Sequence, residues 1–152
     1  MDPLIKLKYT IDILFGHNTS KFLPKPMTFF LSHKNGRLRN VYYNDQLLCT
    51  LRIDGGLAIS IFLATMLLKN EKFLTYCLEV DKVSKPFIEK GRSVFCNHVT
   101  WCGKNVHIQS DVPVLYQNKV IAIGKAMLSS EMIISQSRGV AVKIRNSLKC
   151  HR

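Results

Sequence analysis

The first half of the chain carries short runs in which apolar and polar residues alternate, the pattern of strands with one buried face. Two of these runs flank Asn35-Gly36, a pair that favours a tight hairpin because both residues tolerate positive φ. A third run ends at Asp54-Gly55-Gly56, and the Leu-, Ala- and Met-rich stretch after it predicts a helix by residues 65–69. The predicted strands are residues 28–31, 37–43 and 46–53. We expect a three-stranded meander with a helix on one face, whereas residues 1–18 predict no particular element.

The second half shows more numerous and shorter strand patterns, with two short helices among them. A polar break at residues 70–72 marks the boundary, so we expect domains at residues 1–74 and 75–152. One helix begins at Ser129-Ser130-Glu131, where a serine hydroxyl can cap it and the acid suits its dipole. The predicted strands are residues 75–80, 93–99, 106–109, 112–116, 120–126 and 140–145, with a turn at 101–105. This spacing predicts an α+β chain whose second half is a small closed or nearly closed barrel of short strands.

A basic turn in the second half is the strongest candidate for binding an anion. Pro86 can begin a short helix, because its missing N–H falls where the helix has no partner for one, and Gly91 can end the turn with positive φ. We expect that so short an element cannot pair all of its backbone N–H groups, which favours an anionic ligand such as a phosphate. The cations around this turn are Lys85, Lys90 and Arg92.

Polar side chains follow the turn on the strand predicted at residues 93–99. The alternation there puts His98 on one face and Asn97 on the other, next to the basic cluster. Near the end of the chain the same kind of alternation leaves Lys143 and Arg145 outward. A solvated basic turn joined to an ordinary core strand would give the same pattern, so the residues alone leave both interpretations open.

The composition indicates a folded, basic protein. Of 152 residues, 47% are hydrophobic, which is typical of a globular chain. Lysine and arginine number 22 against 10 acids, and the formal net charge of +12 favours a polyanionic partner such as nucleic acid. A basic protein with no such partner, or one on an acidic membrane surface, would share this charge. The membrane interpretation lacks the charge block beside an amphipathic or spanning helix that would support it.

The sequence disfavours several other classes of protein. The first ten residues lack the apolar core of a signal peptide, and the longest low-polarity run, residues 57–68, is well short of the ~20 residues of a membrane span. Five cysteines form no Cys-x-x-Cys pair, so we expect mostly buried thiols in a reducing cytosol. No glycine turn exposes a Ser or Cys nucleophile, and no nucleotide-binding glycine motif is present. We therefore expect a cytoplasmic protein that is not an enzyme.

Three motifs of the second half appear in a distinctive order. They are Pro86-Phe87-Ile88 with Gly91-Arg92-Ser93-Val94-Phe95, then Gly124-Lys125-Ala126-Met127-Leu128-Ser129, then Arg138-Gly139-Val140-Ala141-Val142-Lys143-Ile144-Arg145. Together they resemble a PUA domain of the archaeal kind. The first half carries Phe15-Gly16, Gly36-Arg37-Leu38-Arg39, Leu51-Arg52 and Asp54-Gly55. These motifs resemble the domain that precedes PUA in archaeosine tRNA-guanine transglycosylase.

The resemblance covers nearly the whole chain and implies a small pre-PUA domain followed by a PUA pseudo-barrel. In that family the two modules lie downstream of a catalytic barrel and hold the tRNA, with PUA on the acceptor stem and 3′ end. The resemblance thus implies tRNA binding in support of archaeosine formation. It implies no base exchange by this chain, because 152 residues cannot also hold a (β/α)₈ barrel of ~250 residues. The implied partner is a separately encoded tRNA-modifying enzyme, and no cofactor is expected.

The sequence also departs from the family in two ways. The family's zinc site, with three close cysteines and a histidine, is not reproduced in this sequence. The nearest candidates do not follow the spacing of a metal site, so we expect no metal: Cys96, His98, Cys102 and His107. The position after Cys96, often basic in PUA relatives, is Asn97. The residues expected to contact RNA are Lys85, Lys90, Gly91, Arg92, Asn97, His98, Lys125, Arg138, Lys143 and Arg145. A ribosome-associated translation re-initiation factor and a module that binds an acidic protein remain alternatives.

Overall fold

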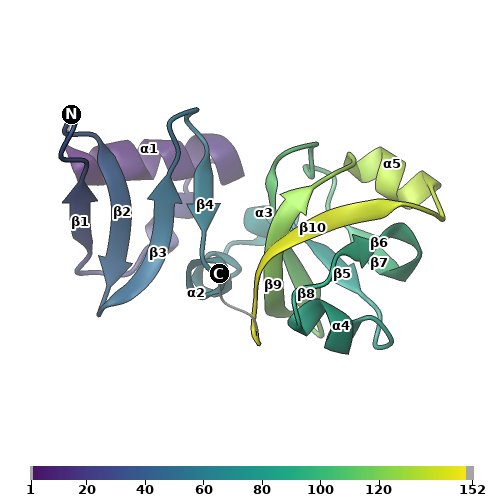
Figure 1. Cartoon of the computed structure of the whole chain (residues 1–152). Coiled ribbons are helices and arrows are strands. Elements are labelled where there is room, and N and C mark those ends of the chain that lie inside the picture. Colours follow the sequence, from purple (N-terminus) through teal and green to yellow (C-terminus); the bar gives the residue numbers. More distant parts are fainter. Residues whose placement is uncertain (1, 150–152) are drawn as a thin grey trace. The chain divides into compact units, whose positions relative to one another are not determined.

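A computed structural model describes residues 2–149, which contain both helices and strands (Figure 1). The chain forms two compact units that meet in sequence between Phe73 and Leu74. Each unit combines helices with a sheet, so the predicted α+β class is confirmed.

The first unit is a four-stranded antiparallel sheet in the order β1-β2-β3-β4, with helix α1 along one face (Figure 1). Its elements are α1 (Pro3–Phe15), the 3₁₀ turn η1 (Thr19–Phe22), β1 (Thr28–Leu31), β2 (Leu38–Tyr43), β3 (Gln46–Leu51), β4 (Leu57–Ile59) and α2 (Ile61–Leu67). A further short helix, α3 (Glu71–Leu74), lies at the boundary between the units.

Helix α1 occupies the segment for which the pattern predicted no element. The carboxylate of Asp2 caps it by accepting the Leu4 N–H at 3.2 Å, and Pro3 occupies its first turn. A buried stripe with a spacing of four residues follows, which is the spacing of one helix face. The stripe consists of Leu7, Ile11 and Phe15. The ring of Phe15 packs edge-on against Phe73, with centroids 5.2 Å apart, and so ties α1 to the end of the unit.

The sheet of the first unit has one strand more than predicted. Residues 57–59 form β4, in which Ile59 pairs with Cys49 of β3, instead of beginning the helix. Helix α2 starts only after Ser60, whose hydroxyl accepts the Leu63 N–H at 3.1 Å as an N-cap. The Leu- and Ala-rich composition was therefore overridden by pairing with the neighbouring strand.

The second unit is a six-stranded mixed sheet curled into a nearly closed pseudo-barrel. Its order is β6-β10-β9-β8-β5-β7, and all neighbours are antiparallel except the parallel pair β5 and β8. The elements are β5 (Leu78–Val80), α4 (Lys85–Glu89), β6 (Val94–Phe95), the 3₁₀ turn η2 (Cys96–His98), β7 (Val99–Cys102), β8 (Asp111–Tyr116), β9 (Lys119–Ala126), α5 (Ser130–Ser135) and β10 (Val140–Ser147).

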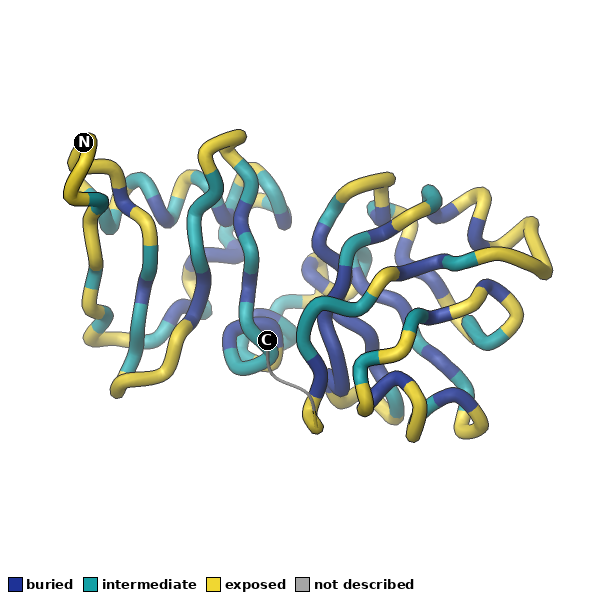
Figure 2. The backbone as a smooth tube through the Cα atoms, in the orientation of Figure 1, coloured by how far each residue is buried: buried dark blue, intermediate teal, exposed yellow. Residues whose placement is uncertain are grey.

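The interior of this unit is apolar, and its exposed residues gather in the connecting loops (Figure 2). Strands β8 and β9 are buried along most of their length. Gly124 on β9 is needed where β10 passes, because a Cβ there would collide with the carbonyl of Lys143. The prediction of a small barrel with two short helices is confirmed.

Local predictions in this unit differ in accuracy. Helix α5 is capped as predicted, since the Ser129 hydroxyl accepts the Met132 N–H at 3.4 Å and Glu131 lies in its first turn. The strand predicted at 106–109 is wrong, because this segment turns and Gln109 has φ of 74°. The turn predicted at 101–105 starts too early, because residues 101 and 102 still belong to β7.

Candidate functional site

The basic turn at residues 85–92 has the predicted shape but not the predicted free amides. Helix α4 contains Pro86 in its first turn, and Gly91 adopts φ of 94°. However, the N–H of Gly91 donates to the Ile88 carbonyl at 2.9 Å, and that of Arg92 to the Phe87 carbonyl at 3.1 Å. The expectation of unpaired N–H groups was wrong because the turn folds back on its own carbonyls. An anion at this turn would therefore have to be bound by side chains.

Arg92 contacts one exposed aromatic ring and lies close in sequence to a second. Its guanidinium carbon is 5.9 Å from the centroid of the Phe87 ring, a cation–π contact. Phe87 and Phe95 are 50% and 48% exposed, which is unusual for phenylalanine. Phe95 belongs to β6, only three residues beyond Arg92. A cation that contacts an exposed ring combines a charge for phosphates with a π-face for bases.

Strand pairing extends this cationic surface across three strands. Val142 of β10 pairs with Val94 of β6, which places Lys143 close in register to the segment that begins at Arg92. Lys143 in turn pairs directly with Lys125 of β9, so the two side chains share a face. Two like charges facing each other on a sheet repel, and a bound anion would relieve that repulsion.

Asn97 and Arg138 lie at the other end of β6. The predicted strand 93–99 is interrupted there, because residues 96–98 form η2. The N–H of Cys96 donates to the Gly139 carbonyl at 3.0 Å, which brings the loop carrying Arg138 beside η2. Both side chains are exposed. The alternation of residues 93–99 failed because its last residues turn away from the strand.

Three of the predicted site residues are already held by carboxylates. Their pairs are Lys85 Nζ with Glu89 Oε1 at 2.8 Å, His98 Nδ1 with Asp81 Oδ2 at 2.9 Å, and Arg145 Nη2 with Asp111 Oδ2 at 2.9 Å. Lys85 also lies over the Tyr116 ring, 5.4 Å from its centroid. The hydrogen bond with Glu89 raises the pKa of Lys85, and that bond lowers the pKa of Glu89 although burial opposes the change. Each of these three side chains is thus held by a contact within the fold.

The remaining cations of the predicted set are not paired in this way. Within residues 2–149, no carboxylate lies within 4 Å of their charged groups. They are Lys90, Arg92, Lys125, Arg138 and Lys143. We call Arg92, Lys125 and Lys143, with the rings of Phe87 and Phe95, the β6–β10 surface.

Sequence reasoning missed the acids that hold the other cations. Glu89 is 7% exposed and is also approached by Lys149, whose Nζ lies 3.8 Å from Oε2. The spacing of Lys85 and Glu89, four residues apart on a short helix, was a visible signal for their pair. The partner of Arg145, Asp111, is 34 residues away, and no local pattern could reveal it.

The cysteines are buried thiols, as expected, wherever the structure describes them: Cys49, Cys77, Cys96 and Cys102. The fifth cysteine, Cys150, lies outside the described residues. Burial raises the pKa of the Cys49 thiol to about 12. From residue 2 to residue 149, no three His, Cys, Asp or Glu side chains gather closely enough to hold a metal ion. Over the same residues, no helix is both long and apolar enough to cross a bilayer.

Each of the two units matches a different known protein family. Residues 76–148 match the PUA domain, and residues 6–73 match the patch-forming domain C2 of tRNA-guanine transglycosylase. The tRNA-guanine(15) transglycosylase of Methanothermobacter thermautotrophicus is 30% identical over 148 residues, covering 95% of this chain and 23% of that protein. That of Thermoplasma volcanium is 29% identical over 143 residues, covering 93% and 23%. The chain thus spans less than a quarter of the length of these relatives.

A solved structure shares the arrangement of elements. A hypothetical protein of the hyperthermophilic archaeon Pyrococcus horikoshii superposes with a TM-score of 0.75 at 18% identity, covering 97% of this chain and 91% of that one. This likeness concerns the fold. The sequence matches identify the chain as a tRNA-guanine transglycosylase C2 domain followed by a PUA domain, homologous to the C-terminal region of tRNA-guanine(15) transglycosylases.

Proposed function

We propose that this chain is a non-catalytic RNA-binding protein that holds tRNA through its PUA domain in the context of archaeosine-type modification. The observation that carries the proposal is the β6–β10 surface, where unpaired cations and exposed rings gather on one edge of the PUA sheet. The homology with tRNA-guanine(15) transglycosylases supports tRNA as the RNA.

The surface suits a folded RNA stem. Lys125, Lys143 and Arg92 supply point charges and a guanidinium fork for phosphate oxygens, which fix position without reading bases. The narrow major groove of A-form RNA prevents side chains from reading its base edges, so recognition follows shape and backbone. Phe87 and Phe95 supply π-faces on which unpaired bases of an end or loop can stack. A stem with a single-stranded end, such as the acceptor stem and 3′ end of tRNA, combines both features.

The proposed division of labour leaves chemistry to a partner. The relatives are more than four times the length that this chain matches, and their name describes a base-exchange reaction. We infer that this chain contributes grip on the tRNA to a separately encoded tRNA-modifying enzyme. The RNA that copurifies with the full chain at mild salt should accordingly be enriched in tRNA.

The proposal is tested by measuring the affinity of the full chain for a tRNA transcript by fluorescence anisotropy over a series of salt concentrations. Arg92→Glu should weaken binding about tenfold or more at ~0.1 M salt, and the dependence of log affinity on log salt should become shallower by roughly one to two. Lys104→Glu, which makes the same charge change at an exposed loop position outside the surface, should change affinity less than about twofold. Equal effects of the two substitutions would contradict the proposal.

Two further measurements separate the alternatives. Co-sedimentation with small ribosomal subunits, without preference for free tRNA, would indicate a translation factor instead. A complex with an acidic protein would survive nuclease treatment, whereas an RNA-bridged complex would fall apart. Either result would overturn the tRNA assignment.

A further inference from the structure

Helix α1 carries apolar side chains on two sides. One side is the buried stripe described above. A second line of apolar residues, also spaced by four, consists of Ile5, Tyr9 and Ile13, which are 44%, 61% and 80% exposed. With about 100° of rotation per residue, the two lines lie on nearly opposite sides of the helix. We call Ile5, Tyr9 and Ile13 the outer stripe.

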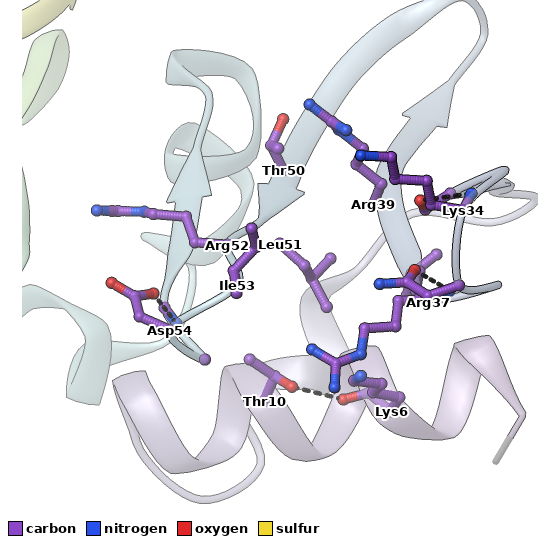
Figure 3. A pocket seen from close by; sticks show the side chains of 15 residues that line it. Lys6, Thr10, Lys34, Arg37, Arg39, Thr50, Leu51, Arg52, Ile53 and Asp54 are labelled. Carbon is purple, nitrogen blue, oxygen red and sulfur yellow. Dashed lines mark hydrogen bonds between the residues drawn. The ribbon is translucent and has the colours of Figure 1, made fainter.

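A polar flank of α1 between the two stripes belongs to a different surface. Lys6 and Thr10 line a hollow of about 830 Å³, together with the loops at residues 32–37 and 52–56 (Figure 3). We call it the cationic hollow because of its basic lining: Lys6, Lys34, Arg37, Arg39 and Arg52. The three residues of the outer stripe do not line this hollow. Their exposure therefore needs a separate explanation.

The outer stripe exposes more apolar surface than a surface helix normally does. Such a helix is usually apolar toward the core and polar toward solvent. Here the solvent side carries two isoleucines and a tyrosine in one line, and adjoining exposed apolar residues mark an interaction site more often than isolated ones do. Tyrosine is also enriched in protein interfaces, because its ring is apolar and its hydroxyl can stay in water. The stripe is therefore a candidate protein-binding surface.

The outer stripe is symmetric about its central residue. Ile5 precedes Tyr9 by four residues, and Ile13 follows it by four. If two such helices pack antiparallel around a two-fold axis at Tyr9, each Ile5 meets Ile13 of the other copy, and the two tyrosine rings meet at the axis. Rows of residues spaced by four are also the ridges that most often interdigitate when helices pack in globular proteins. The stripe is thus complementary to itself, which favours a second copy of this chain as its partner.

The charges beside the stripe are complementary in the same arrangement. Lys8 and Asp12 lie on the flank of α1 that is remote from the cationic hollow. A two-fold axis brings this flank of both helices side by side, so Lys8 of each copy approaches Asp12 of the other. In the described part of the chain, no carboxylate lies within 4 Å of the Lys8 ammonium. Asp12 keeps one oxygen for such a pair, since Oδ1 accepts the Ser20 N–H at 2.8 Å.

We propose that the outer stripe of α1 is a homodimer interface, in which two copies of the chain pack their α1 helices antiparallel with Tyr9 at the two-fold axis. A contact between two helices of this length lies at the low end of specific interfaces, below ~1,200 Å² in total. We expect a weak dimer, with a dissociation constant on the order of 10–100 µM. The inference does not depend on the RNA-binding function proposed above.

Sedimentation equilibrium of the full chain tests the dimer, after nuclease treatment has removed any RNA that could bridge two copies. Loading concentrations from about 5 to 500 µM should show conversion of monomers into dimers, at ~0.3 M salt to screen the repulsion between two basic chains. Ile13→Glu should weaken association at least tenfold, because it places a charge in the apolar contact. The matched control is Ile53→Glu at a loop position that is 94% exposed, which should change association less than about twofold. A parent chain that stays monomeric, or equal effects of the two substitutions, would overturn the interface and leave the RNA-binding proposal intact.

Disulfide cross-linking tests the antiparallel arrangement and does not require a variant that disrupts the contact. In a chain with Cys150→Ser, Tyr9→Cys should cross-link to itself under mild oxidation, because the two copies of this position meet at the axis. Ile5→Cys and Ile13→Cys should each cross-link slowly alone and at least fivefold faster when the two variants are mixed. Fast cross-linking of Ile5→Cys with itself would indicate a parallel pair and overturn the arrangement. Equally slow reactions of all these samples would show that the stripe does not pair with a second copy.

Discussion

The two basic surfaces of this chain differ in how their cations are balanced. In the PUA unit, acids from within the unit hold Lys85, His98 and Arg145, and the unpaired cations lie among exposed aromatic rings. In the first unit, Lys6, Lys34, Arg37 and Arg39 line a hollow and have no described carboxylate within 4 Å, although Asp54 also lines the hollow. Carboxylates therefore offset part of the positive charge of the PUA unit, and its unpaired cations lie among aromatic rings. The hollow of the first unit is lined by unpaired cations and aliphatic side chains.

This difference shows that a count of basic residues does not identify the binding surface. Both units contribute to the net charge of +12. However, when a lysine is paired with a buried glutamate, the carboxylate offsets much of the attraction between that lysine and a phosphate. Pairing decides which cations are available, and pairing depends on the fold.

The largest effect is expected when both surfaces are reversed together. Arg92→Glu combined with Arg37→Glu should lose roughly a hundredfold or more in affinity for intact tRNA, close to the product of the single losses, because the two residues share no contact. Anisotropy titrations of the two single variants and the double variant measure this cycle. A double variant no weaker than the weaker single one would show that only one surface binds.

Removal of a pairing acid should damage the PUA unit without weakening RNA binding. The Asp111 side chain is only 4% exposed and pairs with the Arg145 guanidinium. Asp111→Ala removes this carboxylate and should lower the free energy of unfolding by about 2 kcal/mol. This is below the ~3–5 kcal/mol of a fully buried pair because 34% of the Arg145 side chain reaches solvent. Urea unfolding of the parent chain and the variant measures the loss. Weaker tRNA binding by the folded variant would contradict the distinction between held and available cations.

Acid should weaken the PUA unit through Glu89. The hydrogen bond with Lys85 lowers the Glu89 pKa below its ordinary value of 4.5, so the carboxylate stabilises the fold above that value. This contribution is lost as the pH falls through the folded-state pKa. Thermal unfolding between about pH 6 and pH 3 should therefore show a steeper loss for the parent chain than for Glu89→Gln. Parallel curves would show that this pair contributes nothing to acid sensitivity.

The smallest effect is expected at a cation that is already held. Lys85→Gln should change tRNA affinity by less than about twofold, whereas Arg92→Gln should reduce it about fivefold, or roughly 1 kcal/mol. Both substitutions remove one charge at the same turn, so each serves as the control of the other. Equal losses would mean that the Glu89 pair opens when RNA binds.

Much of the fold was accessible from local patterns. Alternation and the Asn35-Gly36 turn predicted the first three strands, and the serine cap predicted α5. Helix α1 was missed although Asp2, Pro3 and the spacing of its buried residues were all visible, because the lysines between them masked the stripe. Strand β4 was missed because its pairing with β3 outweighed a composition that favours a helix.

The candidate site was less accessible than the fold. Strand pairing does bring together segments that the sequence prediction had grouped, since Lys125 and Lys143 are paired and lie close in register to the turn at Arg92. The sequence did not reveal which basic side chains pair with a carboxylate and which do not. The Arg145–Asp111 and His98–Asp81 pairs join positions distant in sequence. The cationic hollow was invisible for the same reason, since its walls come from three separate segments.

The buried thiols provide a built-in reporter for each unit. A thiol with a pKa near 12 is almost entirely protonated at neutral pH, whereas the thiolate is the form that attacks alkylating reagents. Cys49 would therefore be labelled only when the first unit opens, and Cys77 and Cys102 only when the second does. In a chain with Cys150→Ser, mass spectrometry of alkylation rates would give separate opening free energies for the two units. Bound tRNA would slow labelling in whichever unit it grips.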